Sequence, residues 1–132
     1  MTRRQARKEI LDCLYKAEMG VDAEDALKEC IGDKQFEFIK DFVRLVREDI
    51  VFCDGKISCY ARNWDLSRIN EVDKNILRMG IAEICLMKSE VKIAINEAVE
   101  LAKKYSSEKS AAFINGILDK VAREQNQPSG SK

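Results

Sequence analysis

Residues 92–122 read KIAINEAVELAKKYSSEKSAAFINGILDKVA, and this stretch decides the fold class. Apolar residues return in it every three or four positions, which is the period of a helix with one buried face. The pattern predicts one helix over residues 93–105 and a second over residues 109–123. The positions expected to point inward are Ile95, Ala98, Val99, Ala102 and Tyr105 in the first helix and Ile114, Ile117, Leu118 and Val121 in the second.

The same period extends through the residues that precede this stretch. It predicts further helices over residues 3–19, over 23–30, from 33 to about 54, and from 71 to about 87. The Asp54-Gly55 pair either ends the third of these or marks a break before a further turn through Tyr60. Asn63-Trp64-Asp65 is expected to form a tight connection.

Four residues have the properties that helix ends require. Gly20 is expected to end the first helix, because glycine adopts the left-handed conformation found there at little cost. Asp33 and Asn70 have short side chains with an acceptor oxygen and are predicted N-caps. Asp65 is expected to cap a short turn.

The composition agrees with an all-α fold. Hydrophobic residues make up 45% of the 132 residues and charged residues 35%, which excludes a disordered chain and favours helices with one exposed face. Pro128 is the only proline, so little interrupts long helices. We expect one domain over residues 1–124 and a disordered polar tail over residues 125–132.

The charges balance, with 23 basic and 23 acidic residues. Indiscriminate nucleic-acid binding needs a broad excess of lysine and arginine, so the composition argues against it. Residues 1–8 nevertheless hold four cations and no acid, whereas residues 22–33 hold five acids and one lysine, which is compatible with a small basic patch. No stretch is apolar enough for a membrane span or a signal core, so we expect a soluble, cytoplasmic protein.

The sequence offers little for catalysis or metal binding. It contains no histidine, which is the commonest general base and the commonest metal ligand. Neither a glycine-rich phosphate loop nor a nucleophile-elbow motif occurs. The five cysteines lack CxxC spacing and are interpreted as small buried residues in a reducing cytosol. We therefore expect no enzyme activity, no cofactor and no metal site.

The first predicted helix has a basic side. The residues that face away from its apolar stripe are Arg4, Lys8, Leu11 and Tyr15. Arg3 and Arg7 fall nearer the stripe but are expected to reach solvent at the helix start. Arginine pairs with phosphate oxygens through two parallel hydrogen bonds, and an exposed tyrosine offers a face to an unpaired base. A basic helix start with a half-buried tyrosine explains this pattern equally well.

The last predicted helix has a similar flank beside its apolar stripe. It holds Lys109, Phe113, Gly116, Lys120 and Arg123. A phenylalanine between cations, with a glycine that permits close approach, suits a strand of RNA. Taken alone, the pattern is better explained by a phenylalanine at the margin of the core with cations beside it for solubility.

Three segments resemble the NusB transcription antitermination factor family. NWDLSRI at residues 63–69 and VDKNILR at 72–78 are similar to its central segment, and residues 92–122 are similar to its C-terminal signature, nearly unbroken. Arg3-Arg4, Ala6-Arg7, Leu14-Tyr15 and Glu18 resemble its basic opening helix. Residues 21–60 show no match, so the resemblance covers about two-thirds of the chain.

The resemblance implies a fold of about seven helices in two small bundles. It also implies binding to the boxA element of nascent ribosomal RNA, together with the ribosomal protein NusE. That pair joins a complex on RNA polymerase that resists premature termination, including Rho-dependent termination. By position, the residues implied to contact RNA are Arg3, Arg4, Arg7, Tyr15 and Phe113, which the helical pattern also singles out. The family includes monomers and homodimers, so either state is compatible with the sequence.

Four further positions bear on partner contact or RNA binding. Asp73 aligns with an acidic position on the family's NusE-facing surface, although a first-turn acid is equally favoured by the helix dipole. Lys109 stands where relatives often carry an acid, and we expect it to strengthen RNA binding. Ser106 replaces a usual glycine, which can alter the turn before the last helix, and Gln5 replaces a common third basic residue, which should slightly weaken phosphate contact.

Two other interpretations remain. The chain can be a fragment of an RNA cytosine methyltransferase whose N-terminal part shares this helical fold, although such enzymes need a further Rossmann-like domain that 132 residues do not supply. Alternatively, it can be a helical protein-interaction module without an RNA role. The second interpretation predicts that Arg4 and Phe113 can be replaced without loss of function.

Overall fold

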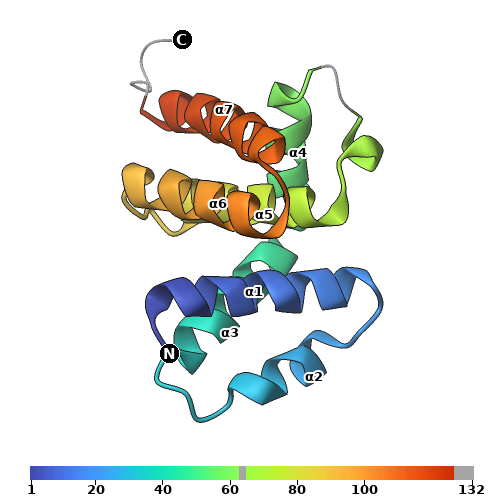
Figure 1. Ribbon diagram of the computed structural model, residues 1–132, viewed down its shortest axis with the longest axis vertical. Helices are drawn as coiled ribbons and strands as arrows, with labels where there is room; N and C mark the ends of the chain where they lie inside the picture. The colour runs from blue at the N-terminus through green and yellow to red at the C-terminus, as the bar shows by residue number, and fades with distance from the viewer. Residues whose placement is uncertain (63–64, 127–132) are drawn as a thin grey trace. The chain divides into compact units, whose positions relative to one another are not determined.

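The computed structural model describes residues 1–62 and 65–126, and every regular element in these ranges is helical. The α-helices are α1 (Arg3–Glu18), α2 (Ala23–Leu27), α3 (Phe36–Glu48), α4 (Ile50–Tyr60), α5 (Glu71–Ile81), α6 (Val91–Tyr105) and α7 (Glu108–Gln125), as Figure 1 shows. Short 3-10 turns form η1 (Lys28–Cys30) and η2 (Leu66–Arg68), and a π-helical turn forms η3 (Ala82–Leu86). The all-α prediction is confirmed.

The first of two compact units, Met1–Ile50, is built from α1, α2 and α3. α1 packs against both other helices. The side chains at the centre of this unit, each at most 4% exposed, are Ile10, Leu14, Leu27, Ile39, Phe42 and Val43. Phe38 packs edge-on against Phe42, with ring centroids 5.7 Å apart, and is half-buried. Phe38 therefore lies at the margin of this core.

The second unit starts at Val51, and α5 is its most buried helix. Every residue from Asp73 to Cys85 is buried, and α6 and α7 pack on α5 as well as on each other. Figure 1 shows α6 and α7 side by side in this unit. A Cβ atom added to Gly80 would lie 2.6 Å from Cδ1 of Leu118. A glycine at this position therefore permits the close approach of α5 and α7.

A buried ion pair joins α5 to α4. Arg78, which is 4% exposed, donates from Nε to Oδ1 of Asp54 at 2.7 Å and from Nη2 to Oδ2 at 3.0 Å. Its Nη1 donates to Oδ1 of Asn75 at 3.0 Å. A buried guanidinium group is costly unless its donors are satisfied, and this bidentate pair satisfies several of them.

The predicted ends of two helices are confirmed. Beyond α1, Gly20 has a φ of 99°, its N–H donates to the carbonyl of Ala17, and the N–H of Val21 donates to that of Lys16. These two bonds form a Schellman motif, which requires a left-handed residue at the position of Gly20. At α5, the side chain of Asn70 accepts a hydrogen bond of 2.8 Å from the backbone N–H of Asp73.

Two predicted boundaries are wrong. Asp33 does not cap α3, because the helix begins three residues later, and its Oδ2 instead accepts from the backbone N–H of Gln35. The Asp54-Gly55 pair neither ends nor breaks a helix, since both residues lie within α4. The break falls at Asp49, the C-cap of α3. Asp65 occupies the N-cap position of η2, but its side chain makes no capping hydrogen bond.

Three predicted burials are also wrong. Tyr105 is 39% exposed, whereas Leu11 is 4% exposed and belongs to the core rather than to the basic side of α1. Among the cysteines, Cys59 is exposed and the other four are buried. The expected connection at Asn63-Trp64 and residues 127–132 of the expected tail lie outside the described residues. Gln125, the first residue of that expected tail, is instead the last residue of α7. Within the described ranges, no helix has the length and apolar character needed to cross a membrane.

Candidate nucleic-acid interface

Arg3 is held against the surface of the first unit. Its guanidinium carbon lies 3.8 Å from the centroid of the Phe38 ring, and its Nε donates to Oε1 of Gln35 at 3.0 Å. A guanidinium group over an aromatic ring is attracted by the negative face of the ring. Arg3 is an exposed residue, so α3 orients a cation that ligands can still reach.

Arg7 does not reach solvent as the helical pattern led us to expect. Only 7% of it is exposed, and its guanidinium carbon lies 5.7 Å from the same Phe38 ring. The Phe38 ring therefore lies beside two arginines that are four residues apart on α1. The burial of Arg7 limits direct contact with any ligand.

The remaining side chains on the basic side of α1 are exposed to different degrees. Arg4 is exposed, and Tyr15 is 39% exposed. They lie eleven residues apart, which is about three turns and about 16 Å along the helix axis, so they share a face. Between them, Lys8 forms an ion pair of 2.7 Å with Asp12. Arg4 and Tyr15 thus mark the two ends of one face.

Gln5 has a structural role at the start of α1. Its backbone N–H donates to Oγ1 of Thr2, and its side-chain oxygen accepts from the backbone N–H of Thr2 at 2.7 Å. This reciprocal pair is a capping box, which satisfies two N–H groups that have no partner within the helix. Gln5 therefore stabilises the helix that carries the arginines.

In the second unit, a cleft of about 320 Å³ brings three of the predicted residues together. It is lined by Arg68, Ile69, Asn70, Asp73, Ser107, Lys109, Ser110 and Phe113. Lys109 and Phe113 lie four residues apart in the first turns of α7, so their side chains share a face. Asp73 comes from the first turn of α5. Arg68 and Ser110 were not singled out by the sequence.

The N-termini of α5 and α7 meet at this cleft. The Asp73 carboxylate contacts Ser110, and Gly80 packs against Leu118, so the paired positions advance in the same direction along both helices. α5 and α7 therefore run parallel. Each helix N-terminus carries a partial positive charge, and the exposed cations Arg68 and Lys109 add to it. This arrangement favours a bound anion such as phosphate.

The Asp73 carboxylate lies inside the cleft and is 5% exposed. Its Oδ2 accepts from Oγ of Ser110 at 2.6 Å and from Nδ2 of Asn70 at 3.1 Å. Ser106 in turn donates from Oγ to Oγ of Ser110 at 3.0 Å, so Ser106 joins this network. Among the described residues, Oδ1 of Asp73 is buried and has no hydrogen-bond partner. The expected contact of Asp73 with a partner protein stays a prediction.

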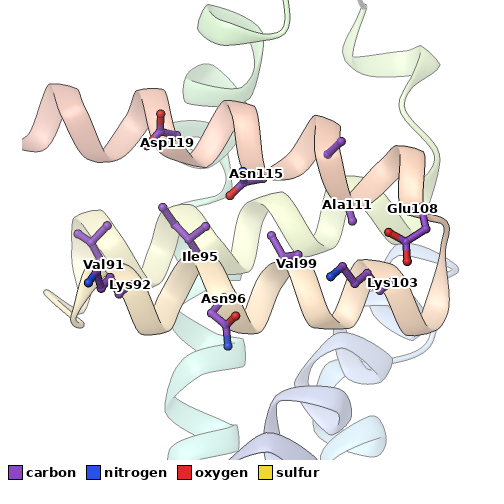
Figure 2. A pocket seen from close by; sticks show the side chains of 11 residues that line it. Val91, Lys92, Ile95, Asn96, Val99, Lys103, Glu108, Ala111, Asn115 and Asp119 are labelled. Atoms are coloured by element: carbon purple, nitrogen blue, oxygen red, sulfur yellow. The ribbon is translucent and has the colours of Figure 1, made fainter.

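A second, larger cleft lies between α6 and α7 and contains none of the predicted residues. Figure 2 shows the apolar side chains of Ile95, Val99 and Ala111 facing it. Two charged residues on its rim already have partners, because Lys103 pairs with Glu100 at 4.0 Å and Asp119 with Arg123 at 2.9 Å. The latter pair places an acid beside Arg123, which belongs to the cationic flank predicted for the last helix and remains exposed. The smaller cleft is therefore the better candidate for binding an anionic chain.

The comparisons with known proteins agree with this architecture. Residues 4–123 match the sequence profile described as the NusB family. A transcription antitermination protein NusB from Anaeromyxobacter sp. (strain Fw109-5) is 40% identical over 129 residues, which cover 92% of this chain and 90% of that protein.

Solved structures are also similar over most of the chain, and two of them are relevant here. NusB from T. maritima is 34% identical with a TM-score of 0.84, covering 94% of this chain and 92% of that one. A complex of the antitermination factors NusB and NusE with double-stranded RNA contains a chain that is 28% identical with a TM-score of 0.79, covering 94% of this chain and 99% of that one. The protein described here belongs to the NusB family.

Proposed function

We propose that this protein is a transcription antitermination factor that binds the boxA element of nascent ribosomal RNA together with the ribosomal protein NusE. Bound there, it joins the antitermination complex on RNA polymerase and suppresses premature, including Rho-dependent, termination. The observation that carries the proposal is the cleft in which Lys109 and Phe113 meet two helix N-termini. The 40% identical antitermination protein and the likeness to a NusB–NusE–RNA complex support it.

Each RNA contact follows from the position of one group. On α1, Arg3 and Arg4 supply cations for phosphate oxygens, and the exposed Tyr15 supplies a face for an unpaired base. On α7, Lys109 supplies a further cation, and Phe113 supplies a ring that lines the cleft. Arg7 is expected to contribute little direct contact, since its burial leaves little surface for RNA.

The number of cations predicts a moderate dependence on salt. The exposed cationic candidates are Arg3, Arg4 and Lys109, and a single strand releases about 0.7 counterion for each neutralised phosphate. The logarithm of the binding constant should therefore fall with a slope of about −2 against the logarithm of the salt concentration. Such weak attraction suits a protein of zero net charge, which then needs NusE to complete the RNA-binding surface.

The proposed role is binding without catalysis. No cofactor is required for it, and the protein would act in the cytoplasm, where ribosomal RNA is transcribed. Contact with NusE and with RNA polymerase requires further surfaces, and we expect Asp73, in the first turn of α5, to belong to the one that faces NusE. Either a monomer or a homodimer is compatible with this role.

Fluorescence anisotropy with a labelled boxA-type RNA and a scrambled control, at two salt concentrations and with or without NusE, tests the proposal. We expect preferential, salt-sensitive binding to boxA that tightens with NusE and weakens in Arg4→Ala and Phe113→Ala. Equal or absent binding of both RNAs, even with NusE present, would refute it and favour a helical protein-interaction module.

A further inference from the structure

The larger cleft, between α6 and α7, is the feature that the proposed function does not use. Its volume is about 520 Å³, and none of the residues that line it also lines the smaller cleft. Ile95 and Val99 face it and are half-buried. Removing such apolar surface from water is favourable. The larger cleft therefore has an apolar floor that a ligand can cover.

The spacing of the lining residues indicates that a helix fits this cleft. Two series line it, one on each helix: Lys92, Asn96, Val99 and Lys103 on α6, and Glu108, Ala112, Asn115 and Asp119 on α7. Both series advance by four, three and four residues, which keeps each within an arc of about 60° on its helix. This is the a/d spacing of helices that pack along a common seam. All eight residues are exposed or half-buried, so the core of the second unit does not use these seams.

The charges at the two ends of the cleft define the helix that fits. Figure 2 shows Lys92 and Asp119 at one end and Lys103 and Glu108 at the other. α6 thus contributes a cation at each end and α7 an acid at each end, about three turns or 16 Å apart. A helix in the cleft meets opposite charges if it carries acids beside α6 and cations beside α7. Turned end for end, it would meet like charges, so the charges also fix its direction.

Several polar groups along the cleft are available to such a helix. Among the described residues, neither Lys92 nor Glu108 forms an ion pair, and the amides of Asn96 and Asn115 make no hydrogen bond. The ion pairs of Lys103 and Asp119 are exposed, so exchanging them costs little. An asparagine in an a/d seam specifies the register of the partner at a cost in stability. The lining therefore favours selective rather than tight binding.

We propose that the larger cleft is the docking surface for one amphipathic helix of a partner protein, with acids along the flank beside α6 and cations along the flank beside α7. The inference does not depend on RNA binding. Lys109 and Phe113 line the smaller cleft, and the helical period places them on a different side of α7 from the seam that begins at Glu108. Both clefts can therefore be occupied at once.

Three helical peptides of about eighteen residues test the charge rule. They share one leucine stripe for the floor and differ in their flanks, which carry glutamate and lysine, glutamate alone, or lysine alone. A cross-link on the outer face holds them helical, since isolated helices of this length are marginal in water. Two exposed ion pairs, worth about threefold each, should give the mixed peptide about a tenfold lower dissociation constant than either uniform peptide. Fluorescence anisotropy at physiological salt measures the three constants.

Variants of the full chain locate the bound peptide. Lys92→Glu should weaken the mixed peptide and strengthen the all-lysine peptide by about threefold each. Lys104→Glu is the matched control, because Lys104 is exposed on the same helix but does not line the cleft. It should leave the preference for the mixed peptide unchanged, since salt screens charges more than about 8 Å apart. Ala112→Trp fills the cleft from an exposed position and should abolish binding of the mixed peptide without changing affinity for boxA RNA.

The possible outcomes separate this proposal from the proposed function. Equal affinities for the three peptides, or binding that survives Ala112→Trp, would overturn it. Displacement of the mixed peptide by boxA RNA would place the peptide in the RNA site and would also overturn it. Self-association of the protein that Ala112→Trp abolishes would make a second copy of this chain the occupant instead. Failure to bind boxA even with NusE would overturn only the proposed function.

Discussion

Gly80 sets the separation of the two helices whose N-termini form the cleft. A Cβ atom at this position would lie 2.6 Å from Cδ1 and 2.8 Å from Cδ2 of Leu118, which is fully buried. Distances this short force a displacement, and overpacking of a core costs about 1–3 kcal/mol. Alanine in place of glycine within a helix contributes about 1 kcal/mol in the opposite direction. Gly80→Ala should therefore destabilise the protein by up to about 2 kcal/mol.

Gly116→Ala measures the second of these effects alone. Gly116 lies inside α7, as Gly80 lies inside α5, but nothing lies within 4 Å of an added Cβ atom there. We expect this control to stabilise the protein by as much as about 1 kcal/mol. The difference between the two variants in the free energy of unfolding, measured by urea denaturation, isolates the clash with Leu118.

A double-mutant cycle identifies the partner. Valine lacks the δ-carbons that the new Cβ would meet, so Gly80→Ala should cost less in a Leu118→Val background than in the unaltered protein. Separation of α5 from α7 should also weaken RNA binding, because it draws Ser110 away from Asp73. If Gly80→Ala stabilises the protein as much as Gly116→Ala does, Leu118 repacks freely and the reasoning is refuted.

Three further predictions concern single side chains. Lys109→Asp should weaken binding of boxA RNA, with about a tenfold rise in the dissociation constant for a lost charged contact, and an unchanged constant would exclude Lys109 from the interface. Arg4→Ala should lower RNA affinity with little change in the free energy of unfolding. Arg7→Ala should mainly lower the free energy of unfolding, because Arg7 is 7% exposed. Fluorescence anisotropy and urea denaturation of both variants will show whether the two effects separate in this way. Burial raises the pKa of the Cys13 thiol to about 12, so its reactive thiolate is scarce at pH 8. Ellman's reagent should therefore modify the exposed Cys59 first. Rapid modification of Cys13 in the folded protein would contradict this prediction. Because that pKa is raised, the folded protein keeps the Cys13 proton to a higher pH than the unfolded chain does. The contribution of Cys13 to stability is therefore complete below about pH 9 and declines as the pH rises toward 12.

Much of the fold was predictable because its signals are local. The spacing of Ile114, Ile117, Leu118 and Val121 identifies the buried face of α7, and all four are buried. Gly20 and Asn70 were recognised as helix ends because the required conformation and the capping oxygen belong to the residues themselves. The break between α3 and α4 has no such signal. It falls at Asp49, with neither glycine nor proline beside it, so the apolar period runs through it.

The candidate site was predictable only in its parts. Lys109 and Phe113 were found from their positions on one helix, but their meeting with Asp73 depends on the parallel packing of α5 and α7. The spacing of apolar residues along the sequence does not predict that two helix N-termini come together. The burial of Arg7 was missed for a related reason, since Phe38, thirty-one residues away in the sequence, lies beside it. A helical wheel considers one helix at a time and cannot include such a neighbour.

The position of Arg3 over Phe38 has a consequence for the timing of binding. A free arginine side chain loses rotamer entropy of up to about 2 kcal/mol when it becomes ordered. Stacking on the ring and the hydrogen bond to Gln35 impose much of that loss when the protein folds, before any RNA arrives. The guanidinium group is then already oriented when it meets a phosphate, so binding costs less conformational entropy. Lysine would keep the charge at this position but would lack the planar group that Phe38 and Gln35 hold in place.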